Sequence, residues 1–287
     1  MAACRQRVVR CASSAGLHRI AYREWGDAGN GRVLLCVHGL TRCARDFDRL
    51  AEALSERYRV VCPDIAGRGD SDWLGDPMLY VIPQYVADMV TLVARLDVES
   101  VHWVGTSMGG LIGMALAAQA GTPVARLVLN DAGPVIAKAS LERIATYLGA
   151  APALPSIEAA EQLVRAVSAP FGPHSDAEWR FLTEIVLRQN ADGSYRFHYD
   201  PRIAEPYRKA MPEKDLELWP LYDAVRCPTL VLRGERSDLL TRETVVQMRE
   251  RGPKAQVAEI AGVGHAPTLL HDDQIAIVRE FLLAGTT

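Results

Sequence analysis

The sequence of 287 residues lacks several features that would assign it to common functional classes. Its 32 Lys and Arg residues are fewer than its 35 Asp and Glu residues, so no basic excess points to nucleic acid or to an anionic membrane surface. No apolar run approaches the roughly eighteen residues that a membrane-spanning helix needs. We therefore expect neither nucleic acid nor a membrane as a partner.

Signatures of cofactor and metal binding are also missing. The six cysteines form no C-x-x-C pair and show no metal-ligand spacing. Cys36 and Cys62 lie inside apolar runs, where a free thiol behaves as a small hydrophobic group. No complete G-x-G-x-x-G opens a helix after a strand, so a dinucleotide fingerprint is absent. We expect no cofactor, no metal, and a reduced, cytoplasmic setting.

The first 23 residues carry five arginines and no acidic residue, a composition that superficially resembles an organelle transit peptide. They contain no apolar core of the kind found in secretory signals. Residues 5–11 and 17–25 instead show strand patterns joined by a Ser- and Gly-containing turn, with Ile20 and Tyr22 alternating with Arg19 and Arg23. We interpret this region as two strands of the folded protein.

Residues 101–119 change from an apolar strand pattern to a helix of small residues across a sharp turn. Gly105-Thr106-Ser107-Met108-Gly109 fits G-x-S-x-G, and the order of strand, turn and helix gives that match its meaning. Such a turn holds the central serine in a strained backbone conformation, with its Oγ at the carboxyl edge of the sheet. We predict Ser107 as a nucleophile and the Met108 N–H, at the helix start, as an oxyanion donor.

Strand and helix patterns alternate along most of the remaining chain. Apolar strand-like runs occur at residues 33–37, 58–62, 101–104, 126–130, 228–233 and 255–260. This rhythm predicts an α/β fold, with a mostly parallel central β-sheet and helices on both faces. It breaks between Pro134 and Pro220, which bound a segment with 9 of the 16 prolines and helical patterns at 141–148, 157–167 and 178–188. We predict a core of residues 1–133 and 220–287, and a helical cap at 134–219 inserted after the sixth core strand.

Two further segments carry side chains that would activate a serine. A serine hydroxyl needs an adjacent base, and the base needs an orienting carboxylate. His265 lies in a glycine-rich loop after the last strand, a poor place for a packed core histidine. Asp238 follows the preceding strand in a G-x-x-x-D turn, and Asp131 is a rival because it also follows a core strand. We predict the set Ser107, Asp238 and His265.

The chain order Ser, Asp, His and the elbow motif resemble those of the α/β-hydrolase fold family. The resemblance covers about residues 17–133 and 220–283. His38-Gly39-Leu40 matches the family's H-G-x loop, which implies that the Leu40 N–H joins Met108 in an oxyanion hole. Gly67-Arg68-Gly69-Asp70-Ser71 matches the family's G-x-G-x-S loop, which helps to shape the core and is not catalytic. The cap matches only in position and helical character.

The resemblance implies a serine hydrolase that cleaves a small carboxylic ester through an acyl-enzyme intermediate. Lactonases, C–C bond hydrolases and hydrolases of short polyester (hydroxyacid) oligomers on the same fold are alternatives, and a non-catalytic ligand-binding protein is another. Arg42, just after the oxyanion loop, is a possible contact for an anionic group of the substrate. The alternative for Arg42 is an ion pair with Asp46 or Asp48 at the surface.

Overall fold

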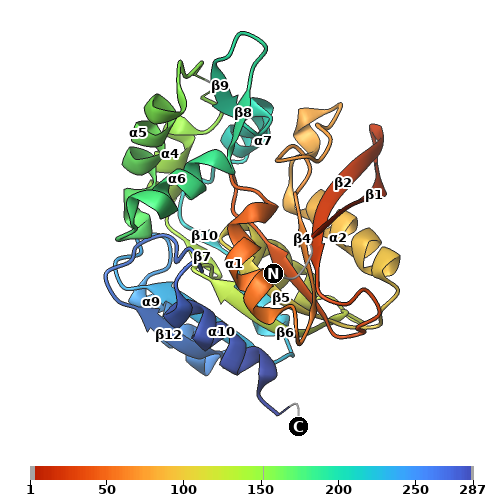
Figure 1. Ribbon diagram of the computed structural model, residues 1–287. Helices are drawn as coiled ribbons and strands as arrows, with labels where there is room; N and C mark the ends of the chain where they lie inside the picture. Colours follow the sequence, from red (N-terminus) through yellow and green to blue (C-terminus); the bar gives the residue numbers. More distant parts are fainter. Residues whose placement is uncertain (1–3, 151, 286–287) are drawn as a thin grey trace.

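The computed structural model describes residues 4–150 and 152–285, and its largest feature is an eight-stranded sheet (Figure 1). Across the sheet the strands follow the order β1-β2-β4-β3-β5-β6-β11-β12. Their bounds are β1 (Arg5–Ser13), β2 (Gly16–Trp25), β3 (Val33–Val37), β4 (Arg59–Pro63), β5 (Val101–Thr106), β6 (Val124–Asn130), β11 (Thr229–Gly234) and β12 (Gln256–Ile260). Strand β2 is antiparallel to both neighbours, and the other adjacent pairs are parallel. The predicted mostly parallel sheet is confirmed.

Helices cover both faces of this sheet because its central strands bury side chains on both sides. All five residues of β3 are buried. Alternate β3 residues Val33, Leu35 and Val37 belong to one apolar cluster, and Leu34 and Cys36 belong to another. The first cluster includes residues of α2 (Ile82–Leu96), α3 (Met108–Ala117), α8 (Trp219–Ala224) and α9 (Arg242–Glu250), and the second includes residues of α1 (Asp48–Leu54) and α10 (Asp272–Leu283).

Two segments, one before and one after β3 in the chain, have their own local structure. The N-terminal segment forms the β1–β2 hairpin, whose register ends with Ser13 opposite Gly16. The segment after β3 forms a 3₁₀ turn, η1 (Ala44–Phe47), and then α1, which ends at Leu54. The Ser55 hydroxyl donates to the Glu52 carbonyl (2.8 Å), which satisfies one of the last carbonyls of α1.

Between β6 and β11 the chain leaves the large sheet, and we call residues 134–219 the cap. Its helical elements are α4 (Lys138–Tyr147), α5 (Ile157–Val167), η3 (Ala169–Phe171), α6 (Asp176–Glu184), η4 (Pro201–Ile203) and α7 (Ala204–Lys209). Its strands form two small antiparallel pairs, β7 (Val135–Ile136) with β10 (Leu216–Glu217) and β8 (Leu187–Gln189) with β9 (Tyr195–Phe197). Figure 1 shows α4 to α7 clustered together beside the core. The strands were not predicted, since two or three residues are too few for a periodic pattern.

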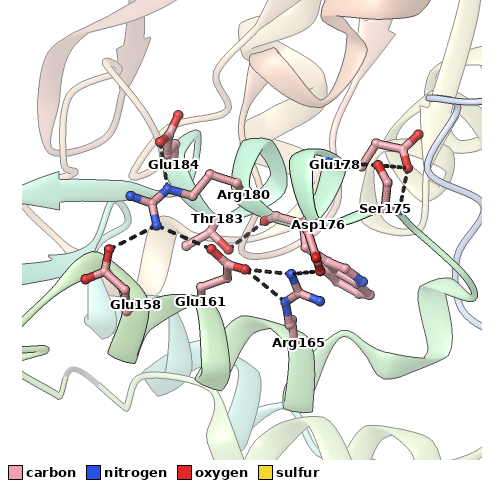
Figure 2. A network of polar contacts seen from close by, with 10 residues as sticks. Glu158, Glu161, Arg165, Ser175, Asp176, Glu178, Arg180, Thr183 and Glu184 are labelled. Carbon is pink, nitrogen blue, oxygen red and sulfur yellow. Dashed lines mark hydrogen bonds and ion pairs between the residues drawn. The ribbon is translucent and has the colours of Figure 1, made fainter.

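A network of ion pairs joins two cap helices (Figure 2). Arg165 of α5 contacts Glu161 of its own helix and Asp176 of α6, at 2.7 Å in both cases. Arg180 of α6 contacts Glu158 and Glu161 of α5. Each exposed pair contributes little by itself, but the network fixes the two helices relative to each other. It thereby positions the inner face of α5, which lines the cavity described below.

A further 3₁₀ turn, η2 (Pro77–Leu79), precedes α2 in the core. Within residues 4–150 and 152–285, no helix combines the length and the apolar character needed to cross a membrane.

Candidate active site

Ser107 occupies the turn between β5 and α3, where its backbone has φ 52° and ψ −114°. A non-glycine residue rarely adopts a positive φ, and the surrounding packing must hold it there. Strand and helix meet so closely that a Cβ on Gly105 would collide with the Gly109 backbone, and a Cβ on Gly109 would collide with the Val37 carbonyl. The two glycines of the motif therefore permit the tight strand–turn–helix geometry that exposes the serine.

His265 lies between a hydroxyl and a carboxylate. Its Nε2 is 2.9 Å from Ser107 Oγ, and its Nδ1 is 2.7 Å from Asp131 Oδ2. With Nδ1–H donating to the carboxylate, Nε2 carries the lone pair that can accept the serine proton. This is the arrangement that a serine nucleophile, its base and an orienting acid require.

The prediction that Asp238 contacts His265 is wrong, because the structure places Asp131 there. Asp238 is half-exposed and its Oδ2 accepts a hydrogen bond from Arg143 of the cap (2.6 Å). Strand β6 lies directly beside β5, whereas β11 is one strand further away, so the residue after β6 reaches the base. The turn after β11 contributes Ser237 instead, whose hydroxyl donates to Asp131 Oδ2 (2.6 Å).

Asp131 is completely buried, and three donors converge on its carboxylate. They are His265, the Ser237 hydroxyl and the Gly234 N–H, which is 2.9 Å from Oδ1. Hydrogen bonds to the charged form compensate a carboxylate for the loss of water. The second and third donors come from the end of β11 and the turn after it, so the residues after both strands contribute to one site.

The predicted oxyanion donors are both close to Ser107 in the chain or in the cavity lining. Met108 is the first residue of α3, so its N–H has no acceptor within the helix. Among the hydrogen bonds of the described residues, neither the Met108 nor the Leu40 N–H donates to a protein acceptor. Leu40 follows Gly39, where an added Cβ would lie 3.8 Å from Ser107 Cβ, and both Gly39 and Leu40 line the cavity. Both amides are therefore available to an oxygen that becomes negative beside Ser107.

His38 supports this loop. Its Nδ1 donates to the Gly39 carbonyl (2.7 Å), and its Nε2 accepts the Ile65 N–H (2.9 Å). Burial lowers the pKa of His38 to about 3, so the ring stays neutral and keeps its acceptor. His38 therefore has a structural position that is separate from the Ser107–His265 pair.

Ser107 and His265 open into a cavity of about 300 Å³ between the core and the cap. Its apolar lining from the cap includes Ile144, Tyr147, Leu163, Val164, Val167 and Phe171. Two cations, Arg42 and Arg143, also line it. The arrangement suits a small, mainly aliphatic ligand with a few polar groups.

Arg42 makes the ion pair with Asp46 that was its alternative prediction, but this pair is largely buried and does not lie at the surface. Its guanidinium contacts both carboxylate oxygens of Asp46 at 2.7–3.1 Å, and it also donates to the Leu182 carbonyl of the cap at 3.4 Å. Only 13% of the Arg42 side chain is exposed. Arg42 therefore ties the oxyanion loop to the cap, and its charge is already compensated.

Within the described residues, one group has the spacing of a metal site, and it lies away from the cavity lining. Cys11, His18 and Asp88 are buried between the β1–β2 hairpin and α2, with ligand atoms within 4.8 Å of one another. His18 Nε2 is 3.1 Å from each Asp88 carboxylate oxygen, so the histidine and the carboxylate already pair with each other. These residues are separate from the Ser107 chemistry.

Comparisons with known proteins agree with this fold. The pattern of the α/β hydrolase fold family matches residues 32–272. A 3-hydroxybutyrate-oligomer hydrolase of Cupriavidus necator is 52% identical over 280 residues, which are 95% of this chain and 96% of that protein. An α/β hydrolase structure from Novosphingobium aromaticivorans has a TM-score of 0.87 and 38% identity, covering 98% of this chain and 99% of that one. A structure from Rickettsia typhi has a TM-score of 0.90 and 31% identity, covering 98% of both chains. The chain belongs to the α/β hydrolase fold family.

Proposed function

We propose that this protein hydrolyses short linear ester oligomers of a small 3-hydroxy acid, of the 3-hydroxybutyrate type. Hydrolysis of an ester bond is the activity that the family and its relatives support for this chain. The observation that carries the substrate proposal is the largely apolar cavity above Ser107, which has a cation with an exchangeable partner in its wall. A hydroxy-acid oligomer combines an aliphatic chain, ester carbonyls and one terminal carboxylate, and so matches that lining.

The proposed reaction follows from the positions of the side chains. Ser107 Oγ attacks the ester carbonyl while His265 Nε2 takes its proton, and Asp131 stabilises the resulting imidazolium. The carbonyl oxygen becomes negative and is received by the N–H groups of Leu40 and Met108. The tetrahedral intermediate collapses as His265 returns the proton to the leaving hydroxyl of the oligomer. Water then attacks the acyl-Ser107 ester with His265 again as base, which releases the second acid and restores the serine.

Arg143 is the group that we propose to receive the substrate carboxylate. Its side chain is 44% exposed, it lines the cavity, and its ion pair is with the half-exposed Asp238. An exposed pair of this kind is worth about 0.2–1 kcal/mol, so another carboxylate can replace Asp238 at little cost. Arg42 is less suitable because it is mostly buried and already bound to both Asp46 oxygens.

The state of the cysteines supports a proposed cytoplasmic location. Cys4, Cys11, Cys36, Cys43, Cys62 and Cys227 are free thiols. Free thiols persist in a reducing compartment such as the cytoplasm.

Kinetics on a matched pair of esters test the proposal. The substrates are the linear 3-hydroxybutyrate dimer with its free carboxylate and the methyl ester of that dimer, with Ser107→Ala as the blank. We expect Arg143→Gln to lower kcat/KM for the acid about tenfold, mainly through KM, and to change the methyl ester less than threefold. Asp238→Asn should have the opposite effect on the acid, because it frees Arg143.

The results test the proposed substrate separately from the proposed ester hydrolysis. Equal losses on both esters would show that Arg143 does not recognise the carboxylate. Hydrolysis of p-nitrophenyl butyrate with neither dimer cleaved would retain the ester hydrolase and reject the hydroxy-acid substrate.

A further inference from the structure

Arg68 has a completely buried guanidinium in the loop between β4 and η2. Its Nε–H donates to the Leu40 carbonyl at 2.9 Å. Its Nη1 donates to the Ala66 carbonyl at 2.7 Å and to the Tyr85 hydroxyl at 2.8 Å, and its Nη2 lies 3.8 Å from Met108 Sδ. Each of these partners is neutral.

The absence of an acidic partner distinguishes Arg68 from the other inward-facing arginines. Arg42 pairs with Asp46, Arg59 with Glu24 and Arg233 with Glu259. Over the described ranges 4–150 and 152–285, no carboxylate oxygen lies within ion-pair distance of Arg68; the Tyr80 and Tyr85 rings lie 5.6 and 5.2 Å from its guanidinium carbon. Cation–π contacts offset only part of the loss of hydration of a buried charge. The fold thus maintains an uncompensated positive charge in its interior.

The position of Arg68 beside the proposed oxyanion donors indicates a role for its charge. Leu40 and Met108, which Arg68 contacts, are the residues whose N–H groups face the carbonyl oxygen in the proposed mechanism. We propose that Arg68 is a positioning residue of the oxyanion hole, which holds the Leu40 carbonyl, one peptide unit after the Leu40 N–H, and supplies positive potential to the tetrahedral intermediate. The missing counter-charge then forms on the substrate oxygen during the reaction. This inference rests on the proposed serine mechanism and is independent of which ester is the substrate.

Neighbouring groups agree with this position. The pKa of His38 is lowered to about 3, first by burial and additionally by the positive charges of Arg68 and Arg42. The loop around Arg68 also contacts the cap, through the Gly69 N–H to the His198 carbonyl (2.9 Å) and the Asp200 N–H to the Gly67 carbonyl (2.7 Å). Preorganised charge is effective because it needs no rearrangement when the transition state forms.

The test separates charge from packing with four variants. Arg68→Met and Arg68→Gln remove the charge, and Arg68→Lys keeps it. Arg59→Met is the control, because it removes a partly buried arginine of β4 that pairs with Glu24 and the Leu96 carbonyl and not with Leu40 or Met108. The readouts are kcat and KM on p-nitrophenyl butyrate and thermal unfolding. Inhibition constants are measured for an alkyl trifluoromethyl ketone, which forms an anionic adduct with serine, and for the matching neutral alcohol.

We expect both neutral variants to lose roughly 100-fold in kcat, with KM changed less than threefold. Affinity for the ketone should fall by a similar factor while affinity for the alcohol stays constant, and Arg68→Lys should recover at least tenfold. Similar activity in the Lys and neutral variants, or equal loss of ketone and alcohol affinity, would overturn the inference. So would a full kcat in a folded neutral variant. If Arg68→Met does not fold, the comparison of Arg68→Gln with Arg68→Lys decides.

The failure of the serine mechanism would look different. In that case the wild-type protein itself would form no ketone adduct and would not be labelled by a fluorophosphonate at Ser107. The proposed role of Arg68 would then be rejected by results on the wild-type protein alone, before any Arg68 variant is measured.

Discussion

Asp131 and Asp238 have the same side chain, and their different surroundings decide which of them contacts His265. Asp131 has a positive φ of 50° after β6 and is completely buried. It accepts hydrogen bonds from His265, the Ser237 hydroxyl and the Gly234 N–H. Asp238 is half-exposed and points toward Arg143 of the cap. The two aspartates should therefore respond differently to the same substitution.

Asp131→Asn should lose about 10³–10⁴-fold in kcat on a neutral ester, because an amide cannot stabilise the imidazolium or fix its tautomer. Asp238→Asn should change kcat on that ester less than threefold. Steady-state kinetics on p-nitrophenyl butyrate, with circular dichroism to verify folding, make the measurement. A large loss in the Asp238 variant and a small one in the Asp131 variant would return the acid to the β11 turn.

The sequence could identify the nucleophile and the base but not choose between these acids. Ser107 and His265 are each marked by their own glycine-rich turn. Asp131 and Asp238 both follow buried strands, and the choice depends on which strand lies beside β5. Strand order comes from contacts between residues far apart in the chain, and local patterns do not encode it. Ser237 was equally hidden, since a hydroxyl in a turn usually serves the turn itself.

At the scale of the elements, the packing of α3 on the sheet is the tightest constraint near the site. Gly109 is followed by Gly110 and Gly113 in α3; a Cβ on Gly110 would meet Ala132, and one on Gly113 would meet Trp103. The Trp103 indole N–H also donates to the Gly109 carbonyl (3.0 Å). The helix therefore uses its glycines to approach β5 and β3, although glycine is a poor helix former.

Gly109→Ala should destabilise the protein by more than about 2 kcal/mol and should also reduce activity. An alanine in a helix is normally favoured over glycine by about 1 kcal/mol, so the sign of the effect reveals the clash with Val37. Ala115→Gly in the same helix is the control, which should lose only about 1 kcal/mol and keep its kcat. Chemical denaturation measures both. A stabilised Gly109→Ala protein would mean that α3 is free to move away from the sheet.

The elements that the sequence predicted best are those with long apolar patterns. The strands of the large sheet and helix α5 lie where the periodicity placed them. The short cap strands were missed, and so were the contacts between cap and core. One such contact is the Cys43 thiol, which donates to the Ile185 carbonyl. Nothing in either segment alone predicts this pairing, because it arises only when the cap folds over the oxyanion loop.

For the molecule as a whole, buried ionisable groups couple stability to pH in opposite directions. Burial lowers the pKa of His38 to about 3 and that of His102 to about 4. Burial raises the pKa of Asp64 to about 6, although the N–H groups of Ala44 and Asp70 donate to its carboxylate. Below about pH 6.5 these two histidines bind protons in the unfolded chain but stay neutral in the folded chain. The free energy of unfolding therefore decreases as the pH falls. Asp64 behaves in the reverse sense, because its folded form takes up a proton at a higher pH than the unfolded form.

Two variants should therefore change the pH dependence of unfolding with opposite signs. His38→Gln should reduce the stability lost between pH 7 and pH 5 by about 2 kcal/mol. A proton that binds only in the unfolded state lowers the free energy of unfolding by about 1.4 kcal/mol per pH unit below 6.5. Asp64→Asn should make the loss of stability between pH 7 and pH 4.5 steeper, because protonation of Asp64 in the folded state raises the free energy of unfolding of the wild-type protein over that range. Urea denaturation at several pH values gives the free energies, and each variant is compared with its own value at pH 7. Parallel curves for both variants and the wild-type protein would show that neither group is held away from its ordinary pKa by the fold.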